Sequence, residues 1–374
     1  MRALLFLYFV ISLTSCTSPE KTKSIGEKSS VIASGFKIEN FENFKIITLN
    51  NPWQKYDGQG IRYILTDNPH NLPDSLLQET IIKIPVQTTI TFSTTHVGFI
   101  SALDKNSGIV GVSGKDFISN PELRKSIDSG TCFDVGFAPN IDYERILMLK
   151  PDMVFLYGLD PSVTAIVKRL KDAGIQSVLV SEFLEPEALG KAEWIRFFAA
   201  FLDCGSKADS IFNVVESNYQ ESRKIASQFK TKPKILVGLP FKDTWFMAGG
   251  KSFTARLIED AGGEYLWNDN SNTDFIPLDL ESVFQKAGNA DIWINSGTAQ
   301  TIQEILSYDK RLEYIPALKN GKIFNNNLKV NEFGGNDFWE SGAVRPDYIL
   351  DDLIHIFHHN DSENYVFNYY KIIR

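Results

Sequence analysis

The fold is decided by the stretch NIDYERILMLKPDMVFLYG (residues 140–158), which returns in weaker form as LDLESVFQKAGNADIWINSG (residues 278–297). In each copy an aspartate, Asp142 or Asp279, stands where it can cap a short helix. A Pro or a Gly-Asn pair then ends the helix, and an apolar strand, MVFLY or IWIN, follows. The chain therefore contains two units of one design, which predicts two similar lobes rather than one continuous domain.

Length and composition agree with two globular units. The chain has 374 residues, 43% of them hydrophobic, which exceeds what one core usually holds. Its formal net charge is −8 and it contains no run of Lys or Arg, so we expect no nucleic-acid partner. Beyond the signal region the only cysteines are Cys132 and Cys204, which make no disulfide framework, and the sequence leaves open whether they pair.

The order of expected strands and helices predicts an α/β protein with mainly parallel sheets. Residues 36–205 form the expected N-terminal α/β lobe, residues 206–230 a long rigid linking helix, and residues 231–374 the C-terminal α/β lobe. Within the first lobe, residues 36–93 are rich in β-branched side chains and should be strands joined by turns. The role of this segment does not follow from the sequence.

The first residues are typical of an export signal. Residues 1–15, MRALLFLYFVISLTS, carry one basic residue and an apolar run too short to span a bilayer. The end of this segment with Cys16 resembles a lipobox, the site where bacterial lipoproteins are cleaved and lipidated; a plain secretory signal with an incidental cysteine is the alternative. Residues 16–35 read as a flexible tether. The run 17–21 lacks the acidic residues of some surface-export signals, so we expect a lipid-anchored protein on the periplasmic face of a membrane, inner or outer being open.

Together these features resemble a family. The run Asp142-Tyr143-Glu144-Arg145-Ile146 leading to Leu149-Lys150-Pro151-Asp152, the segment FMAGGK (246–251) and the segment EDAGG (259–263) are similar to motifs of the class III substrate-binding proteins of ABC importers. This is the family of the vitamin B12 and ferric-siderophore binding proteins, and the similarity covers about residues 90–355. It implies two α/β lobes joined by a helix, a ligand held between them, and the membrane subunits of an importer as partner. We expect a monomer.

The resemblance implies that Glu144 and Glu281 protrude from the two lobes and pair with arginines of the importer's membrane subunits. Two carboxylates far apart on one face would fix the orientation of the protein on a two-fold partner. Alternatively, a Glu in the first turn of a helix merely favours the helix dipole, by about 0.3–1 kcal/mol. The matched position in two related units favours docking.

Aromatic residues in loops are the candidates for contacting the ligand, because ligands of two-lobe α/β proteins bind at loops that follow strand ends. Rings suit a large, flat or apolar ligand, such as a ferric siderophore, a corrinoid or haem. The resemblance points most directly to Tyr157, Phe241, Trp245 and Phe275. The full set of expected ligand-binding residues is Phe117, Phe137, Tyr157, Phe241, Trp245, Phe275, Trp339 and Arg345. Since the chain has 27 Phe, some of these rings could simply fill cores.

Two other classes of function compete. A binding protein for free zinc or manganese would need three or four His, Asp or Glu ligands. His355, His358 and His359 have helical spacing but no His companion in the expected ligand loops, so we expect no metal site. An extracytoplasmic enzyme is the second alternative; none of the Gly-x-Ser-x-Gly, phosphate-loop or dinucleotide motifs is present, and we expect neither catalysis nor a cofactor.

Overall fold

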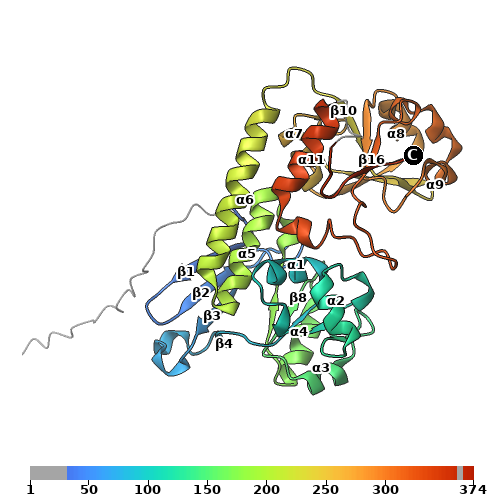
Figure 1. Cartoon of the computed structure of the whole chain (residues 1–374). Coiled ribbons are helices and arrows are strands. Elements are labelled where there is room, and N and C mark those ends of the chain that lie inside the picture. Colours follow the sequence, from blue (N-terminus) through green and yellow to red (C-terminus); the bar gives the residue numbers. More distant parts are fainter. Residues whose placement is uncertain (1–31, 360–364) are drawn as a thin grey trace, which may run out of the picture.

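The computed structural model describes residues 32–359 and 365–374 (Figure 1). The predicted signal peptide, Cys16 and the tether up to residue 31 lie outside the described residues. Within the described part, no helix is long and apolar enough to cross a membrane.

The chain begins with a four-stranded sheet that is separate from the main sheet of the N-terminal lobe, and we call it the accessory sheet. Its strands lie in the order β1 (Phe36–Asn40), β2 (Lys45–Leu49), β3 (Ile61–Thr66) and β4 (Thr80–Lys83). The first three pair antiparallel and β4 pairs parallel to β3. The segment predicted as one α/β unit, residues 36–205, therefore contains two separate sheets, because the parallel sheet of the lobe starts only at β5.

The N-terminal lobe is a five-stranded parallel sheet with helices on it. The strands are β5 (Thr89–Thr91), β6 (Ile109–Val112), β7 (Phe133–Asp134), β8 (Met153–Leu156) and β9 (Ser177–Leu179), in the order β7-β6-β5-β8-β9. The helices are α1 (Thr94–Ala102), α2 (Pro121–Asp128), α3 (Tyr143–Leu149) and α4 (Val163–Asp172). All four residues of β8 are buried, as is typical of a central parallel strand covered on both faces.

Two long helices pass between the lobes (Figure 1). Helix α5 (Ala188–Leu202) is buried on nearly every side, and α6 (Gly205–Ala226) follows it directly. At 1.5 Å per residue, α6 is about 33 Å long. The last helix, α11 (Pro346–His358), packs along α6, with Asn218 Nδ2 donating to Asp347 Oδ2 over 3.1 Å. The predicted linking helix, α6, therefore passes between the lobes together with α5 and not alone.

The C-terminal lobe repeats the α/β arrangement. Its five-stranded sheet has the order β13-β10-β15-β16-β17, from β10 (Lys234–Val237), β13 (Glu264–Tyr265), β15 (Ile292–Ile294), β16 (Ile323–Asn325) and β17 (Lys371–Ile372), and only β17 is antiparallel. A second, antiparallel sheet contains β11 (Pro240–Phe241), β12 (Thr244–Ala248) and β14 (Phe275–Asp279). The helices are α7 (Phe253–Asp260), α8 (Leu280–Ala287), α9 (Ile302–Tyr308) and α10 (Pro316–Lys319). The predicted fold class, two α/β lobes joined by a long helix, is confirmed.

The accessory sheet is fixed to the N-terminal lobe. The ring of Phe36 packs edge-on against Trp194 of α5, with the ring centroids 4.9 Å apart. Residues 32–35, the last four of the segment predicted as a tether, donate backbone hydrogen bonds to the buried carboxylates of Glu185 and Glu193. Residues 32–35 are therefore fixed to the N-terminal lobe and are not part of a flexible tether.

Candidate functional site

Three predicted ligand residues lie where parallel strands of the N-terminal sheet end. Phe117 follows β6, Phe137 follows β7 and Tyr157 follows β8, and their exposed fractions are 47%, 59% and 45%. We call these three residues the N-terminal aromatic edge. Because the carboxyl ends of parallel strands meet at one edge of a sheet, the three rings share that edge, which is where α/β proteins bind ligands.

Asp134, at the end of β7, positions two of these loops. Its Oδ1 atom accepts hydrogen bonds from the backbone N–H of Gly114 over 3.1 Å and of Gly136 over 3.0 Å. Gly114 has a φ of +73°, a conformation that glycine adopts without strain. One carboxylate thus sets the start of the turn that carries Phe117 and of the loop that carries Phe137.

The C-terminal lobe presents aromatic rings on one face of its antiparallel sheet. Phe241 pairs with Thr244, Phe246 with Pro277, and Phe275 with Ala248. Since directly opposed residues of paired strands share a face, Phe241, Phe246 and Phe275 lie on the same face. Their exposed fractions are 63%, 50% and 70%. We call these three residues the C-terminal aromatic face.

The prediction that Trp245 contacts ligand is wrong. Its side chain is completely buried on the opposite face of β12, where its Nε1 donates to the carbonyl of Val237 over 3.0 Å and its ring packs near Trp293. Alternation along the strand places Phe246, which was not predicted, on the exposed face. Successive residues of β12 point to opposite faces of the sheet, so Trp245 and Phe246 cannot both be exposed. The sequence of the strand does not show which of the two faces outward, whereas its pairing with β14 does.

Trp339 and the segment around it join the two lobes. Trp339 is half exposed and lines a small void with Asn295, which directly follows β15. Nearby, the amide of Asn331 donates to the carbonyls of Asp116 and Ile118 over 2.8 and 3.1 Å. The loops that follow β6 in one lobe and β16 in the other are therefore in contact.

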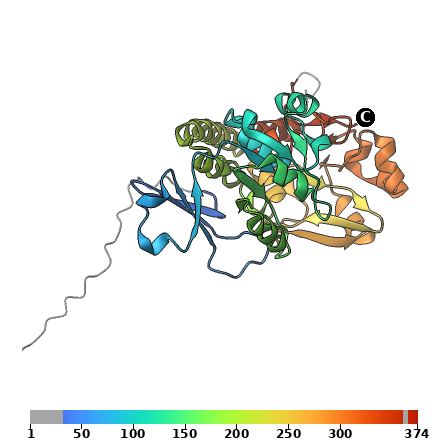
Figure 2. The same ribbon diagram turned by 90° about the horizontal axis from the view of Figure 1, so that it is seen from below.

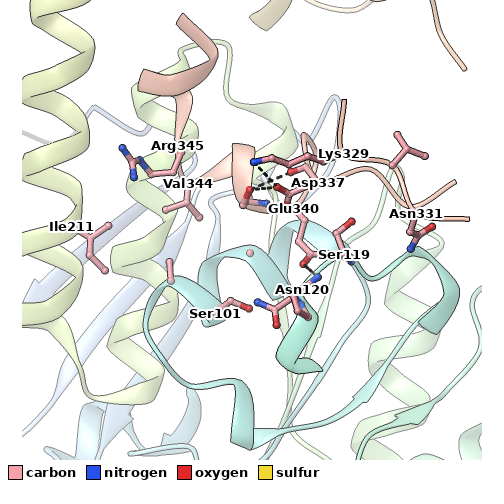
Figure 3. Close-up of a pocket in the computed structure, with 15 residues that line it drawn as sticks. Ser101, Ser119, Asn120, Ile211, Lys329, Asn331, Asp337, Glu340, Val344 and Arg345 are labelled. Carbon is pink, nitrogen blue, oxygen red and sulfur yellow. Dashed lines mark hydrogen bonds and ion pairs between the residues drawn. The ribbon is translucent and has the colours of Figure 1, made fainter. Parts of the chain in front are cut away.

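A cavity of about 780 Å³ lies between the lobes, beside α6 (Figure 3). From the N-terminal lobe it is lined by α1 and the start of α2, and from the C-terminal lobe by residues 329–345. Of the predicted ligand residues only Arg345 lines it. Arg345 forms an ion pair with Asp347, with donor–acceptor distances of 2.9 and 2.6 Å, so its guanidinium already has an anionic partner.

Glu340 is the most buried charged group of this cavity and was not singled out by the sequence. Its carboxylate accepts hydrogen bonds from the backbone N–H of Ser119 over 2.8 Å and of Asn120 over 2.7 Å, at the start of α2. It thereby links the C-terminal lobe to the N-terminal lobe. Burial, against the opposing effect of these two donors, raises the pKa of Glu340 to about 7.

The two predicted docking residues occupy equivalent places in the lobes. Glu144 lies in the first turn of α3, capped by Asp142, and Glu281 in the first turn of α8, capped by Asp279. Both are exposed, and Figure 1 shows α3 in the lower lobe and α8 in the upper one. Glu281 forms an ion pair with Arg311 over 3.0 Å, and hydrogen bonding to this guanidinium lowers the pKa of Glu281.

The histidines of α11 are engaged in packing. His358 stacks on Phe229 with centroids 3.9 Å apart, and its Nε2 lies 2.9 Å from the carbonyl of Ala261. His355 stacks on Tyr365. Across residues 32–359 and 365–374 no group of three or more His, Cys, Asp or Glu side chains is placed to hold a metal ion. Cys132 and Cys204 are both free.

Comparison with known proteins identifies the class to which this architecture belongs. The model of the periplasmic binding protein family matches residues 90–326, and the chain belongs to that family. The protein is a substrate-binding protein of ABC transporters, and its structural neighbours are described as binding proteins. The match begins at β5, so the accessory sheet lies outside it.

Individual proteins share the sequence pattern or the fold. An uncharacterized lipoprotein of Methanocaldococcus jannaschii is 25% identical over 81% of this chain and 73% of its own length. A possible iron-binding periplasmic protein of Staphylococcus epidermidis shares the fold with a TM-score of 0.58 at 19% identity, over 73% of this chain and 99% of that one. The periplasmic haem-binding protein HutB of Vibrio cholerae does so with a TM-score of 0.55 at 20% identity, over 71% and 98%.

Proposed function

We propose that this protein captures a bulky metal chelate or corrinoid, a ferric siderophore, cobalamin or haem, between its lobes and delivers it to an ABC importer. The observation that carries the proposal is the exposure of six aromatic residues, three at the carboxyl edge of the N-terminal sheet and three on one face of the C-terminal sheet. Exposed rings in such numbers favour a large, largely apolar ligand.

The inter-lobe cavity is less suited to be the main ligand site. Its charged groups are already paired with one another or with backbone groups: Lys329 with Asp337, Arg345 with Asp347, and Glu340 with the start of α2. A ligand entering there would have to replace these ion pairs and hydrogen bonds, whereas at the exposed rings it would displace mainly water, beside the Lys242 ammonium that lies 5.5 Å from the centroid of the Phe241 ring. Solved neighbours in the family are described as haem-binding or iron-binding, which supports the same ligand class.

Binding of three coloured probes tests the proposal. Haemin, cyanocobalamin and a ferric tris-catecholate should be titrated separately into the purified protein, followed by visible absorbance and by quenching of tryptophan fluorescence. We expect one probe to bind with one-to-one stoichiometry, and Phe246→Ala with Phe275→Ala to weaken that binding. Tyr314→Ala is the matched control, because Tyr314 is an equally exposed ring, 65%, at a distance in sequence from both aromatic surfaces. Absence of binding by all three probes would contradict the proposal.

The importer is proposed to recognise Glu144 and Glu281. The support is their matched position, exposure and capping in α3 and α8. Charge reversal of both residues should abolish uptake by cells while the affinity of the purified protein for its ligand stays unchanged. Reversal of Glu122 and Glu313, exposed acidic residues outside these two helices, is the control. Loss of ligand affinity instead of uptake would assign the two glutamates to the ligand site.

We also propose a lipid anchor at Cys16, for which the lipoprotein relatives give support. Two or three acyl chains would hold the protein on a membrane surface. Cys16→Ser should move the protein from the membrane fraction to the soluble fraction after cell lysis and abolish labelling by a fatty-acid analogue. An unchanged membrane fraction would exclude this anchor.

A further inference from the structure

The accessory sheet is attached to the N-terminal lobe beside the N-terminal aromatic edge. Glu185, whose carboxylate accepts from the backbone N–H of Ser34 and Gly35, lies a few residues beyond the end of β9. Phe183, between β9 and Glu185, packs edge-on against Tyr157 with centroids 6.3 Å apart. On the sheet itself, the hydroxyl of Tyr63 accepts from the backbone N–H of Leu179 in β9 over 3.3 Å. The accessory sheet therefore starts from the edge that carries the predicted ligand residues.

The loop between β2 and β3, residues 50–60, is packed rather than free. At its base Asn50 donates through its backbone N–H to Gly35 over 2.7 Å and through its side chain to Ser34 over 2.8 Å. Further along, Pro52 is buried, and Trp53 packs against the main core and edge-on against Tyr56, with centroids 5.0 Å apart. These contacts fix the direction in which the loop leaves the accessory sheet.

The same loop reaches the C-terminal lobe. Gln54 Nε2 donates to Asp274 Oδ1 over 3.4 Å. Asp274 directly precedes Phe275, and its carbonyl accepts from Gly249, which keeps it beside the end of β12. Figure 2 shows the loop (blue) leaving the accessory sheet on the side of the molecule where the antiparallel sheet lies, while α6 and α11 run along the other side.

Resting on the proposed function, we infer that the loop 50–60 is a third wall of the ligand site, which bridges the two lobes and slows exchange of the ligand. At its base, Asn50 is bonded to Ser34 and Gly35, which the carboxylate of Glu185 holds two residues after Phe183, the ring that packs on Tyr157. Further along, Gln54 is bonded to Asp274, the residue before Phe275. The hydrogen bond that links it to Asp274 of the C-terminal lobe is long and exposed, so this hydrogen bond is weak and easily reversed. The loop can therefore part from Asp274 when a ligand enters and close again behind it.

Ligand dissociation kinetics test this inference. In one variant, residues 52–58 are replaced by Gly-Ser-Gly; in a second, Asp274→Ala removes the acceptor from the C-terminal lobe and leaves the accessory sheet untouched. The ligand is whichever of haemin, cyanocobalamin or ferric tris-catecholate the wild-type protein binds. We expect the dissociation rate to rise about tenfold in the first variant and about threefold in the second. Arg62→Ala, which breaks an exposed ion pair with Glu79 on the accessory sheet, is the control and should leave the rate unchanged.

An unchanged dissociation rate in both variants would overturn the inference while leaving the proposed function intact. If the wild-type protein binds none of the probes, the proposed function fails, and the bridge is then tested by hydrogen exchange without ligand. Residues 272–279 should exchange faster in the loop-replacement variant than in the wild-type protein and in Arg62→Ala. Equal exchange in all three would show that the loop does not hold the C-terminal lobe.

Discussion

The two lobes present aromatic rings by different structural means. In the N-terminal lobe, Phe117, Phe137 and Tyr157 stand on loops after parallel strands, and all three are exposed. In the C-terminal lobe the rings stand on strands of an antiparallel sheet, where alternation decides which are exposed. The difference teaches that exposure of a ring on a half-buried strand follows from the register of the strand, whereas in a loop it depends on how the individual turn is built.

The largest expected effect concerns Trp245 and Phe246, and it tests whether alternation along β12 decides which ring is exposed. Trp245 is completely buried in the sheet and its indole N–H is hydrogen-bonded, whereas the neighbouring Phe246 is half exposed. Trp245→Ala should lower the free energy of unfolding by about 3–5 kcal/mol, because it leaves a cavity and an unpaired carbonyl at Val237. Phe246→Ala should change it by less than about 0.5 kcal/mol. Urea unfolding followed by circular dichroism measures both, and a larger loss for Phe246→Ala than for Trp245→Ala would mean that the faces of β12 are reversed.

The contact that Glu340 makes between the lobes can be tested through the pH dependence of the free energy of unfolding. The pKa of Glu340 is about 7 in the folded protein, against 4.5 ordinarily, so the folded state binds this proton more tightly than the unfolded state. The resulting stabilisation is fully present below pH 4.5 and is lost as the pH rises through about 7. A shift of this size corresponds to about 3 kcal/mol.

Glu340→Gln keeps an acceptor for Ser119 or Asn120 but cannot ionise. In urea unfolding at pH 5 and at pH 8, the stability lost between the two pH values should be smaller in this variant by about 2–3 kcal/mol. Asp116→Asn, at an exposed turn next to the same helix start, serves as control and should follow the wild-type protein. An unaltered difference in Glu340→Gln would show that Glu340 is ionised at no cost in the folded state.

Much of the fold was predictable, because it depends on local patterns that repeat. The Asp-capped helix and following strand of each lobe, α3 with β8 and α8 with β15, were identified from capping residues and apolar runs. The separation of the accessory sheet from β5 was not predictable. Both lie in one β-rich stretch, and the change of sheet between Lys83 and Thr89 depends on contacts with β8 and α5, distant in sequence.

The two aromatic surfaces should also contribute unequally to binding. The rings of the C-terminal aromatic face are held by paired strands, so little conformational freedom is lost on binding, while those of the N-terminal aromatic edge stand on loops. We expect Phe275→Ala to weaken affinity for the bound probe about thirtyfold and Phe137→Ala about fivefold. Isothermal titration calorimetry gives both values. A larger loss for Phe137→Ala would reverse the ranking of the two lobes.

Site residues were less predictable than the fold wherever a side chain's partner lies far away in the chain. Arg345 was among the expected ligand-binding residues, but Asp347 and the ring of Tyr348 already contact its guanidinium. Glu340 carries no sequence motif, and its importance comes from meeting Ser119 and Asn120 more than two hundred residues earlier. Periodicity and motif spacing do not contain such pairings.

The smallest expected effect distinguishes the two proposed docking residues. Glu281 is paired with Arg311, whereas among the described residues Glu144 has no such partner, so an importer arginine would have to compete for Glu281 but not for Glu144. Arg311→Ala should raise the pKa of Glu281 towards its ordinary value, because the hydrogen bond that lowers it is lost. NMR titration of the side-chain carboxyl carbon of Glu281 in the wild-type protein and in the variant measures the change. If the pKa of Glu281 does not move, the ion pair is not populated in solution, and the two lobes offer the importer equivalent carboxylates.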